Sequence, residues 1–155
     1  MRIRKGVIGV VVNGDEFLVL ERKHMWRGWE FVKGGLTYME EGGMPCYEDE
    51  ENAVKREIME ETGLDVDILN KFHERVEYEH PEHYKNEFGI DMSSHAIFLV
   101  NADSRDVKLS FEHSNFKWLT YDEARELLTH DEQKRALDIA AKFLKEQKSI
   151  DDFDF

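Results

Sequence analysis

The sequence is poor in the residues that build disulfides, interdomain linkers and membrane spans. Its 155 residues include one cysteine, Cys46, and two prolines, Pro45 and Pro81. A single cysteine excludes an intrachain disulfide and a Cys-x-x-Cys zinc site. The longest apolar run, residues 7–12, is far too short to cross a bilayer, and we expect no cleavable signal peptide. We therefore expect a cytoplasmic protein that does not contact membranes.

Positive charge is also scarce. The chain has 21 lysine and arginine residues against 34 aspartate and glutamate residues, which gives a formal net charge of −13. Proteins bind nucleic acid through basic groups that neutralise phosphates, so we expect no stable nucleic acid binding. A small polyanionic substrate would need bound cations and a few local basic groups to enter a site on this chain.

Length and composition predict one compact domain over residues 1–155. The apolar fraction of 41% is enough for a single core, and no repeat or proline-rich linker divides the sequence. Residues 151–155 predict a frayed acidic tail. No feature of the sequence indicates an oligomeric state.

The pattern of apolar residues predicts strands around one central helix. A helix is expected at residues 50–62, with Gly63 as its left-handed cap. The expected strands are residues 7–12, 17–20, 29–32, 67–78 and 94–101, with shorter ones at 108–111 and 116–119. The polar connector at 79–92 is long enough to overhang a pocket.

The C-terminal part of the chain predicts two helices. Thr120 with Glu123, and Thr129 with Glu132, match the capping-box pattern, and each pair is expected to open a helix. Apolar residues at helical spacing in the second helix are expected to pack in the core. Strands interrupted by a helix and closed by helices predict an α/β protein, with a mixed sheet covered on both faces.

Three carboxylates gather on one turn of the central helix. Glu57, Glu60 and Glu61 point into a single arc roughly 100° wide. Carboxylates at this spacing repel, and each exposed pair destabilises a helix by about 0.2–0.5 kcal/mol. A hard divalent cation would convert the repulsion into coordination, and Mg²⁺ is the expected ion, with Mn²⁺ as a possible substitute. In so acidic a chain, such a turn also occurs as an ordinary solvated face.

The spacing around this turn is more specific than the turn itself. It reads Gly42, five residues, Glu48, seven residues, Arg56-Glu57-Ile58, one residue, Glu60-Glu61, one residue, Gly63-Leu64. Residues 42–64 thus resemble the Nudix box of hydrolases that cleave a nucleoside diphosphate linked to another moiety. The resemblance implies a Nudix-type α/β/α sandwich with a mixed β-sheet. It also extends to residues 29–35 and to residues 112–119, which are most similar to diadenosine tetraphosphate (Ap4A) hydrolases.

One departure from the family pattern concerns the glycines. In most relatives a glycine pair opens the box, but twelve residues separate Gly35 from Glu48 here. Either Gly34 and Gly35 keep the structural role and residues 36–42 are an insertion, or Gly42 and Gly43 have taken it over. The aromatic and β-rich approach to Gly34 favours the first alternative.

The resemblance implies a role for each remaining site residue. Glu57, Glu60 and Glu61 are the expected metal ligands, joined by Glu112 and the carbonyl group of Gly34. Glu57, Glu60 and Glu112 are the candidates for catalysis, since the resemblance implies that a carboxylate also acts as general base. For Glu112 the competing interpretation is an exposed glutamate before a strand.

Other residues are expected to bind substrate or to hold the box together. Lys33 and Arg22 would meet the polyphosphate, although Lys33 could equally be an exposed lysine at a strand end. Tyr78 would stack on a base, unless it belongs to the core or the sheet surface. Glu48 and Arg56 are expected to fix the loop onto the helix. His80 and His83 could suggest zinc, but without cysteine partners we expect both to be solvent-exposed.

The sequence therefore predicts Mg²⁺-dependent hydrolysis of a phosphoric anhydride in a nucleotide polyphosphate. A dinucleoside polyphosphate such as Ap4A is the leading substrate. The alternatives are a diphosphatase acting on a damaged or pterin-bearing triphosphate, and an ADP-ribose pyrophosphatase, for which Pro81 is a weak indication. A Nudix-fold module that senses a nucleotide or binds a protein without catalysis is the alternative from another class.

Overall fold

The structure is a computed structural model that describes residues 1–151, apart from the side chains of residues 39, 41, 45 and 149–151. Its described residues form a mixed sheet of seven strands. The strands are β1 (Ile3–Asn13), β2 (Glu16–Arg22), β3 (Gly28–Glu30), β4 (Val32–Gly35), β7 (Val66–Glu79), β8 (Met92–Ala102) and β9 (His113–Leu119). No helix within this part of the chain is long and apolar enough to span a membrane.

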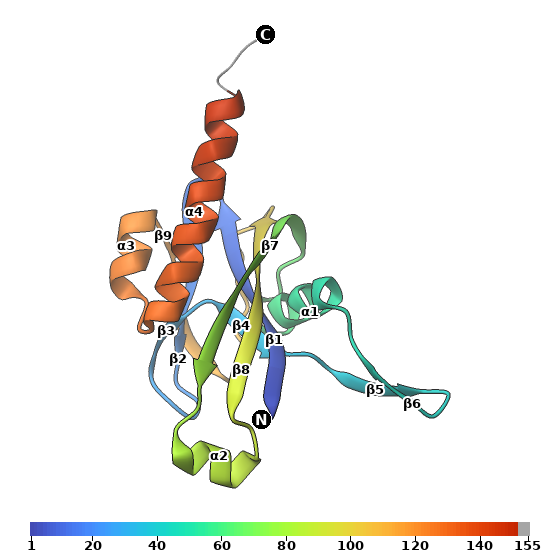
Figure 1. The fold of residues 1–155 in the computed structure, drawn as a ribbon. Helices are drawn as coiled ribbons and strands as arrows, with labels where there is room; N and C mark the ends of the chain where they lie inside the picture. The colour runs from blue at the N-terminus through green and yellow to red at the C-terminus, as the bar shows by residue number, and fades with distance from the viewer. Residues whose placement is uncertain (152–155) are drawn as a thin grey trace.

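Helices cover both faces of this sheet. Helix α1 (Glu50–Thr62) lies on one face, and α3 (Tyr121–Leu127) and α4 (Asp131–Asp151) lie on the other, as Figure 1 shows. Strand β8 is buried on both faces because its side chains alternate between them. Ala96, Phe98 and Val100 pack in the cluster under α1. Ile97 and Leu99 pack in the cluster under α3 and α4. The predicted α/β/α sandwich is confirmed.

Helix α1 has the bounds that the sequence predicts because local signals set both ends. The side chain of Asp49 accepts a hydrogen bond from the backbone N–H of Asn52. Gly63 ends the helix with φ 71°, a left-handed conformation that favours glycine. The helix lies close to β1, since a Cβ atom on Gly9 would lie 2.9 Å from the Cδ1 atom of Ile58.

Strand β1 pairs with β8 along one edge, and two strands share its other edge. Asn13 and Val12 pair with β2, whereas Gly6 to Gly9 pair with β4. The expected strand at 29–32 is accordingly two short strands, because the chain leaves its pairing with β2 at Phe31 and joins β1. This change of partner delivers Lys33, Gly34 and Gly35 to the middle of the sheet.

Two expected features at the C-terminal half are wrong. Residues 108–111 form no strand, because the backbone N–H groups of Lys108 and Ser110 donate to the carbonyl groups of Thr62 and Glu61 at the end of α1. The second capping box is also absent. The Thr129 hydroxyl instead accepts a hydrogen bond from the backbone N–H of Trp29, and α4 begins at Asp131. The first capping box is confirmed: Glu123 accepts from the backbone N–H and hydroxyl of Thr120.

The connector at 79–92 contains a short helix, α2 (Glu82–Phe88), which the sequence analysis did not predict. Strand β9 begins at His113, three residues before the expected start. Of the acidic tail expected at 151–155, residues 152–155 lie outside the described residues, and Asp151 is the last residue of α4.

The residues inserted after Gly35 form an antiparallel hairpin. Strands β5 (Tyr38–Glu41) and β6 (Met44–Tyr47) turn at Gly42 and Gly43 and project away from the sheet (Figure 1). Tyr38, Met44 and Tyr47 are 51%, 70% and 63% exposed. Both turn glycines have positive φ, and nothing lies within 4 Å of a Cβ atom built on either. Residues 36–42, the stretch expected to be an insertion, contain the first strand of this hairpin and part of its turn, at Gly42 and Gly43.

From the contact at the base of the hairpin, we expect that residues 38–47, the arm of the hairpin, are dispensable for folding. The backbone N–H of Glu48 donates to the carbonyl of Thr37 over 2.9 Å, the bond that closes a two-residue turn. Replacing residues 38–47 with Asn-Gly should therefore change the free energy of unfolding by less than about 1 kcal/mol, measured by urea denaturation. A loss of about 2–5 kcal/mol, typical of a core truncation, would show that the arm supports the fold.

Candidate active site

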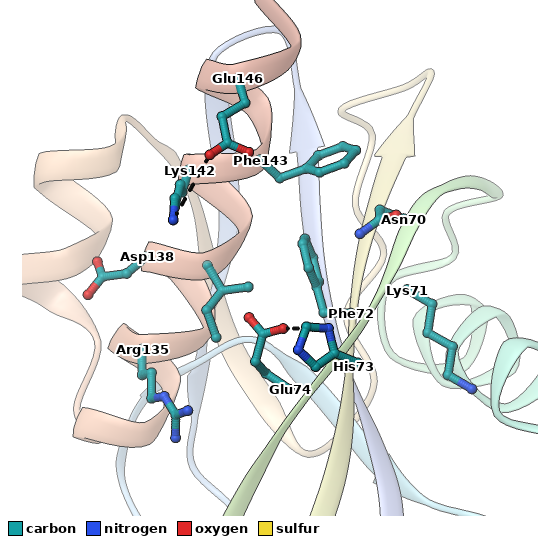
Figure 2. A pocket seen from close by; sticks show the side chains of 11 residues that line it. Asn70, Lys71, Phe72, His73, Glu74, Arg135, Asp138, Lys142, Phe143 and Glu146 are labelled. Carbon is teal, nitrogen blue, oxygen red and sulfur yellow. Dashed lines mark ion pairs between the residues drawn. The ribbon is translucent and has the colours of Figure 1, made fainter.

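Two of the hollows in the described part of the chain differ in their lining, and the predicted residues line only one of these two. The first, with a volume of about 620 Å³, lies between β7 and α4. Figure 2 shows two contacts between polar side chains that line it, His73 with Glu74 and Lys142 with Glu146. Phe72 and Phe143 pack edge to face there. It contains none of the predicted site residues.

The second hollow has a volume of about 780 Å³ and gathers most of the predicted site. The predicted residues that line it are Arg22, Lys33, Gly34, Glu57, Glu61, Tyr78 and Glu112. They come from α1, three strands of the sheet, and the turn before β9. Segments that are far apart in the sequence therefore meet at one site.

Two of the three box carboxylates face this cavity. Glu57 and Glu61 line it, whereas Glu60 does not. The side chain of Glu60 is 57% exposed and pairs with Arg56 over 3.1 Å. In this conformation Glu60 thus lies outside the cavity that Glu57 and Glu61 line, and its role as a metal ligand stays a prediction.

Glu48 and Arg56 form the contact that their expected role requires. The guanidinium of Arg56 donates to both carboxylate oxygens of Glu48, over 2.7 and 2.9 Å. It also donates to the carbonyl of Gly35 over 3.2 Å and to Glu57 over 3.0 Å. The hydrogen bonds from Arg56 lower the pKa of Glu48 to about 2, with smaller help from Thr37 and against the effect of burial. One ion pair thus ties α1, β4 and the base of the hairpin together.

Gly34 leaves room for the carboxylate of Glu57. A Cβ atom at this position would lie 2.1 to 2.5 Å from the carboxyl atoms of Glu57. Any side chain here would displace that carboxylate from the cavity wall. The glycine pair at 34–35, rather than the hairpin glycines, therefore adjoins the helix that carries the box.

Glu61 is the most perturbed acid of the site. It is 6% exposed, and its Oε2 atom is buried without a hydrogen-bond partner. Burial raises the pKa of Glu61 to about 9, with further contributions from the negative charges of Glu57, Glu30 and Glu112. Burial also raises the pKa of Glu57, against the effect of Arg56. Two carboxylates therefore share a wall that offers them little compensation.

Behind this wall lies a buried network that sequence analysis missed. Glu30, 1% exposed, accepts from His113 over 2.9 Å and from Arg22 over 3.0 Å. Burial raises the pKa of Glu30, but the His113 hydrogen bond and the charges of Lys33 and Arg22 outweigh it and lower the pKa. Arg22 also lies 3.7 Å from Glu112. No local pattern marks Glu30, since a glutamate in a strand ordinarily faces solvent.

Aromatic side chains in the lining come from opposite ends of the strand order β3-β2-β1-β8-β7. At the end of β2 and β3, the rings of Trp26 and His130 pack edge to face with their centroids 4.8 Å apart. The Arg22 guanidinium lies 5.9 Å from the centroid of the Trp26 ring. At the β7 end, the ring centroid of Tyr78 lies 5.4 Å from the ammonium nitrogen of Lys33. His80 is half-buried there, bonds to Ser93 and stacks on Tyr84, so its expected solvent exposure is wrong. His83 is exposed, as expected.

Comparison with known proteins identifies the family. The profile of the NUDIX domain matches residues 2–141. The Ap4A hydrolase of C. elegans, in a binary complex, is 26% identical, with a TM-score of 0.71 over 92% of this chain and 98% of that one. No curated protein matches the sequence.

Two further solved structures share the fold. The dihydroneopterin triphosphate pyrophosphohydrolase of E. coli is 21% identical, with a TM-score of 0.65 over 89% of this chain and 96% of that one. The MutT protein of Methanosarcina mazei is 20% identical, with a TM-score of 0.70 over 93% and 96%. The matched profile spans nearly the whole chain and includes the box, the glycine pair and the Glu112 segment. The chain belongs to the Nudix hydrolase family.

Proposed function

We propose that the chain is a Mg²⁺-dependent hydrolase of a phosphoric anhydride in a nucleotide polyphosphate, with dinucleoside polyphosphates such as Ap4A as its substrates. One observation carries the proposal: a single cavity is lined by carboxylates, by cations and by aromatic side chains that come from opposite ends of the strand order. A substrate with a base at each end and phosphates between them matches that set of side chains. The similarity to the C. elegans Ap4A hydrolase supports the same substrate class.

The donor set fits a hard divalent cation. Glu57, Glu61 and Glu112 offer carboxylate oxygens, and Gly34, whose missing side chain leaves room for the Glu57 carboxylate, would add its backbone carbonyl as a ligand. The buried Glu61 Oε2 atom without a partner is the kind of group that an ion would satisfy. Among the described side chains, no three of His, Cys, Asp or Glu lie close enough together to hold a metal in this conformation, in which Glu57 pairs with Arg56 over 3.0 Å.

Each group of residues would have a distinct task. Mg²⁺, when bound, would polarise phosphoryl oxygens and acidify water. Glu112 would accept the proton of the attacking water, held in place by Arg22 and by the backbone bonds from Lys23 and His24 to its carbonyl. Lys33 and Arg22 would bind phosphate oxygens. Water would add across the P–O–P linkage, giving two phosphate-bearing products.

The aromatic side chains from the two ends of the strand order would hold the two bases. Tyr78, which is partly buried, presents a ring beside Lys33, so base stacking and phosphate binding are adjacent at that end. Trp26 and His130 present rings at the other end, beside Arg22. A mononucleotide would occupy only one of these ends.

The proposal predicts a substrate order. Purified protein with Mg²⁺ should hydrolyse Ap4A with a higher kcat/KM than nucleoside triphosphates, a pterin triphosphate or ADP-ribose, and EDTA should abolish each activity. Product analysis by ion-exchange chromatography measures all four reactions. A higher kcat/KM for ADP-ribose or a triphosphate would reject the substrate class. No hydrolysis of any member, with Mg²⁺ or Mn²⁺, would favour a noncatalytic module.

The orientation of the box carboxylates predicts unequal effects of substitution. Glu57→Gln should lower kcat about 10²-fold or more, because Glu57 faces the cavity beside Gly34. Glu60→Gln should lower it less, since this side chain lies outside the cavity and pairs with Arg56. Steady-state kinetics with thermal unfolding of both variants checks this order. A larger loss in Glu60→Gln at equal stability would reverse it.

The buried carboxylate of Glu61, an expected metal ligand, should destabilise the folded protein when no metal is bound. Its pKa is about 9 in the folded metal-free chain against an ordinary 4.5, so stability is lost as pH rises above about 4.5. Glu61→Gln lacks this penalty and should be more stable than the unsubstituted protein by about 1–3 kcal/mol at pH 7 in EDTA. Urea denaturation should show the difference vanishing below about pH 4. Destabilisation by the substitution at pH 7 would contradict the burial argument.

A further inference from the structure

Beyond Lys33, the cavity continues onto an open part of the sheet. Cross-strand pairing places Arg4 beside Ser93, and Ser93 beside Tyr78. Two residues further along, Gly6 lies between Gly35 and His95. Directly opposite residues share a face of a sheet, so these rows form one surface. Arg4, Lys33, Tyr78, Ser93 and His95 all line the cavity.

Neighbouring side chains pack closely on the backbone of the two glycines, Gly6 and Gly35. A Cβ atom on Gly6 would lie 2.8 Å from the Cδ2 atom of His95 and 2.4 Å from the carbonyl oxygen of Gly34. A Cβ atom on Gly35 would lie 2.8 Å from a guanidinium nitrogen of Arg4. The missing side chains therefore let the imidazole of His95 pack directly on the backbone of Gly6, and the guanidinium of Arg4 on that of Gly35.

His95 is a buried polar group that the protein does not satisfy. It is 5% exposed, and its Nδ1 atom is buried without a hydrogen-bond partner. Its ring stacks on Tyr78, with centroids 5.8 Å apart and planes 8° apart. Burial, with the positive charges of Lys33 and Arg4, lowers the pKa of His95 to about 3. The imidazole is thus neutral and keeps one N–H donor and one acceptor nitrogen.

The cations around His95 have no acidic partner in the described part of the chain. Among the side chains that the structure describes, neither Arg4 nor Lys33 takes part in an ion pair. The carboxylate of Glu79, which also lines the cavity, pairs with Lys85 instead. In a chain with a net charge of −13, two unpaired cations in one cavity mark a place for an anion.

We propose that Arg4, Lys33 and His95 form a phosphate subsite that works without metal and binds the phosphate of the substrate half that stacks on Tyr78. The guanidinium and ammonium groups would neutralise the phosphate, and the neutral imidazole would donate an N–H to it. The inference rests on the proposed function for the identity of the substrate. It adds Arg4 and His95 as residues that select a substrate with a phosphorylated second half.

Binding of a product-like probe in EDTA tests the subsite without catalysis. AMP carries one ring and one phosphate, and calorimetry should show it binding more tightly than adenosine or inorganic phosphate. Arg4→Gln should weaken AMP binding about tenfold and leave adenosine binding unchanged. Lys5→Gln is the matched control, because it removes the same charge from the next residue of β1, on the opposite face. Its AMP affinity should change less than about twofold.

A second variant separates binding from folding. His95→Phe keeps a ring against Tyr78 but removes both nitrogens, so it should weaken AMP binding while the melting temperature is retained or raised. Amide resonances of residues 93–95 should shift when AMP is added. Equal weakening by Arg4→Gln and Lys5→Gln, no AMP binding in EDTA, or shifts confined to Trp26 and His130 would each overturn the subsite.

Kinetics distinguishes failure of this inference from failure of the proposed function. With Mg²⁺ and Ap4A, Arg4→Gln should raise KM about tenfold and change kcat less than about threefold. Normal Ap4A hydrolysis with unchanged KM in Arg4→Gln would reject the subsite and leave the hydrolase intact. Absent hydrolysis in the unsubstituted protein, with Arg4-dependent AMP binding, would reject the hydrolase and leave the subsite intact.

Discussion

The arrangement of the site depends on the guanidinium of Arg56. Its two short bonds to Glu48 fix the base of the inserted hairpin to α1, and its bond to the Gly35 carbonyl fixes β4 to the same helix. Hydrogen bonds of this charge-assisted kind are stronger and more directional than neutral ones. The hairpin lies between Gly35 and Glu48 in the sequence, so the two residues are not joined by a short loop that would keep them close. The ion pair performs that task and leaves the hairpin free to project.

The carboxylate wall is a second constraint, and it acts against stability. Burial raises the pKa of both Glu57 and Glu61. The negative charge of Glu57 raises the pKa of Glu61 further, and the charges of Glu60 and Glu112 act on Glu57 in the same direction. Natural cores rarely keep such groups without a counter-charge. Arg56 compensates Glu57 in part, and the Glu30 network holds Arg22 near Glu112. Under the proposed function, the raised pKa values of Glu57 and Glu61 are what a site that binds a cation is expected to show in the absence of the cation.

Local signals made much of the fold predictable. The cap at Asp49 and the left-handed Gly63 fixed α1, and a continuous apolar run, Ala96 to Val100, marked β8. Features set by distant contacts were missed. Thr129 matches a capping box, but its hydroxyl bonds to Trp29 across the chain. Residues 108–111 have a strand-like pattern, but their N–H groups complete the end of α1.

The site shows the same division. Box spacing identified Glu57, Glu61 and the Glu48–Arg56 pair, because the residues lie on one helix and its approach. Arg4, Glu30 and His95 became visible only through strand pairing, since their importance comes from neighbours some thirty to ninety positions away. Helical periodicity alone could not decide that Glu60 turns out of the cavity, because Arg56 takes part in setting that orientation.

The central claim is that Glu57, Glu61 and the Gly34 carbonyl surround a divalent cation beside a bound polyphosphate. Anomalous diffraction from crystals grown with Mn²⁺ and a nonhydrolysable Ap4A analogue measures this directly. The account predicts anomalous density between Glu57 and Glu61, within ligand distance of Gly34, with phosphates running from there toward Lys33. Density elsewhere on the protein, with this wall empty and the analogue bound, would contradict it.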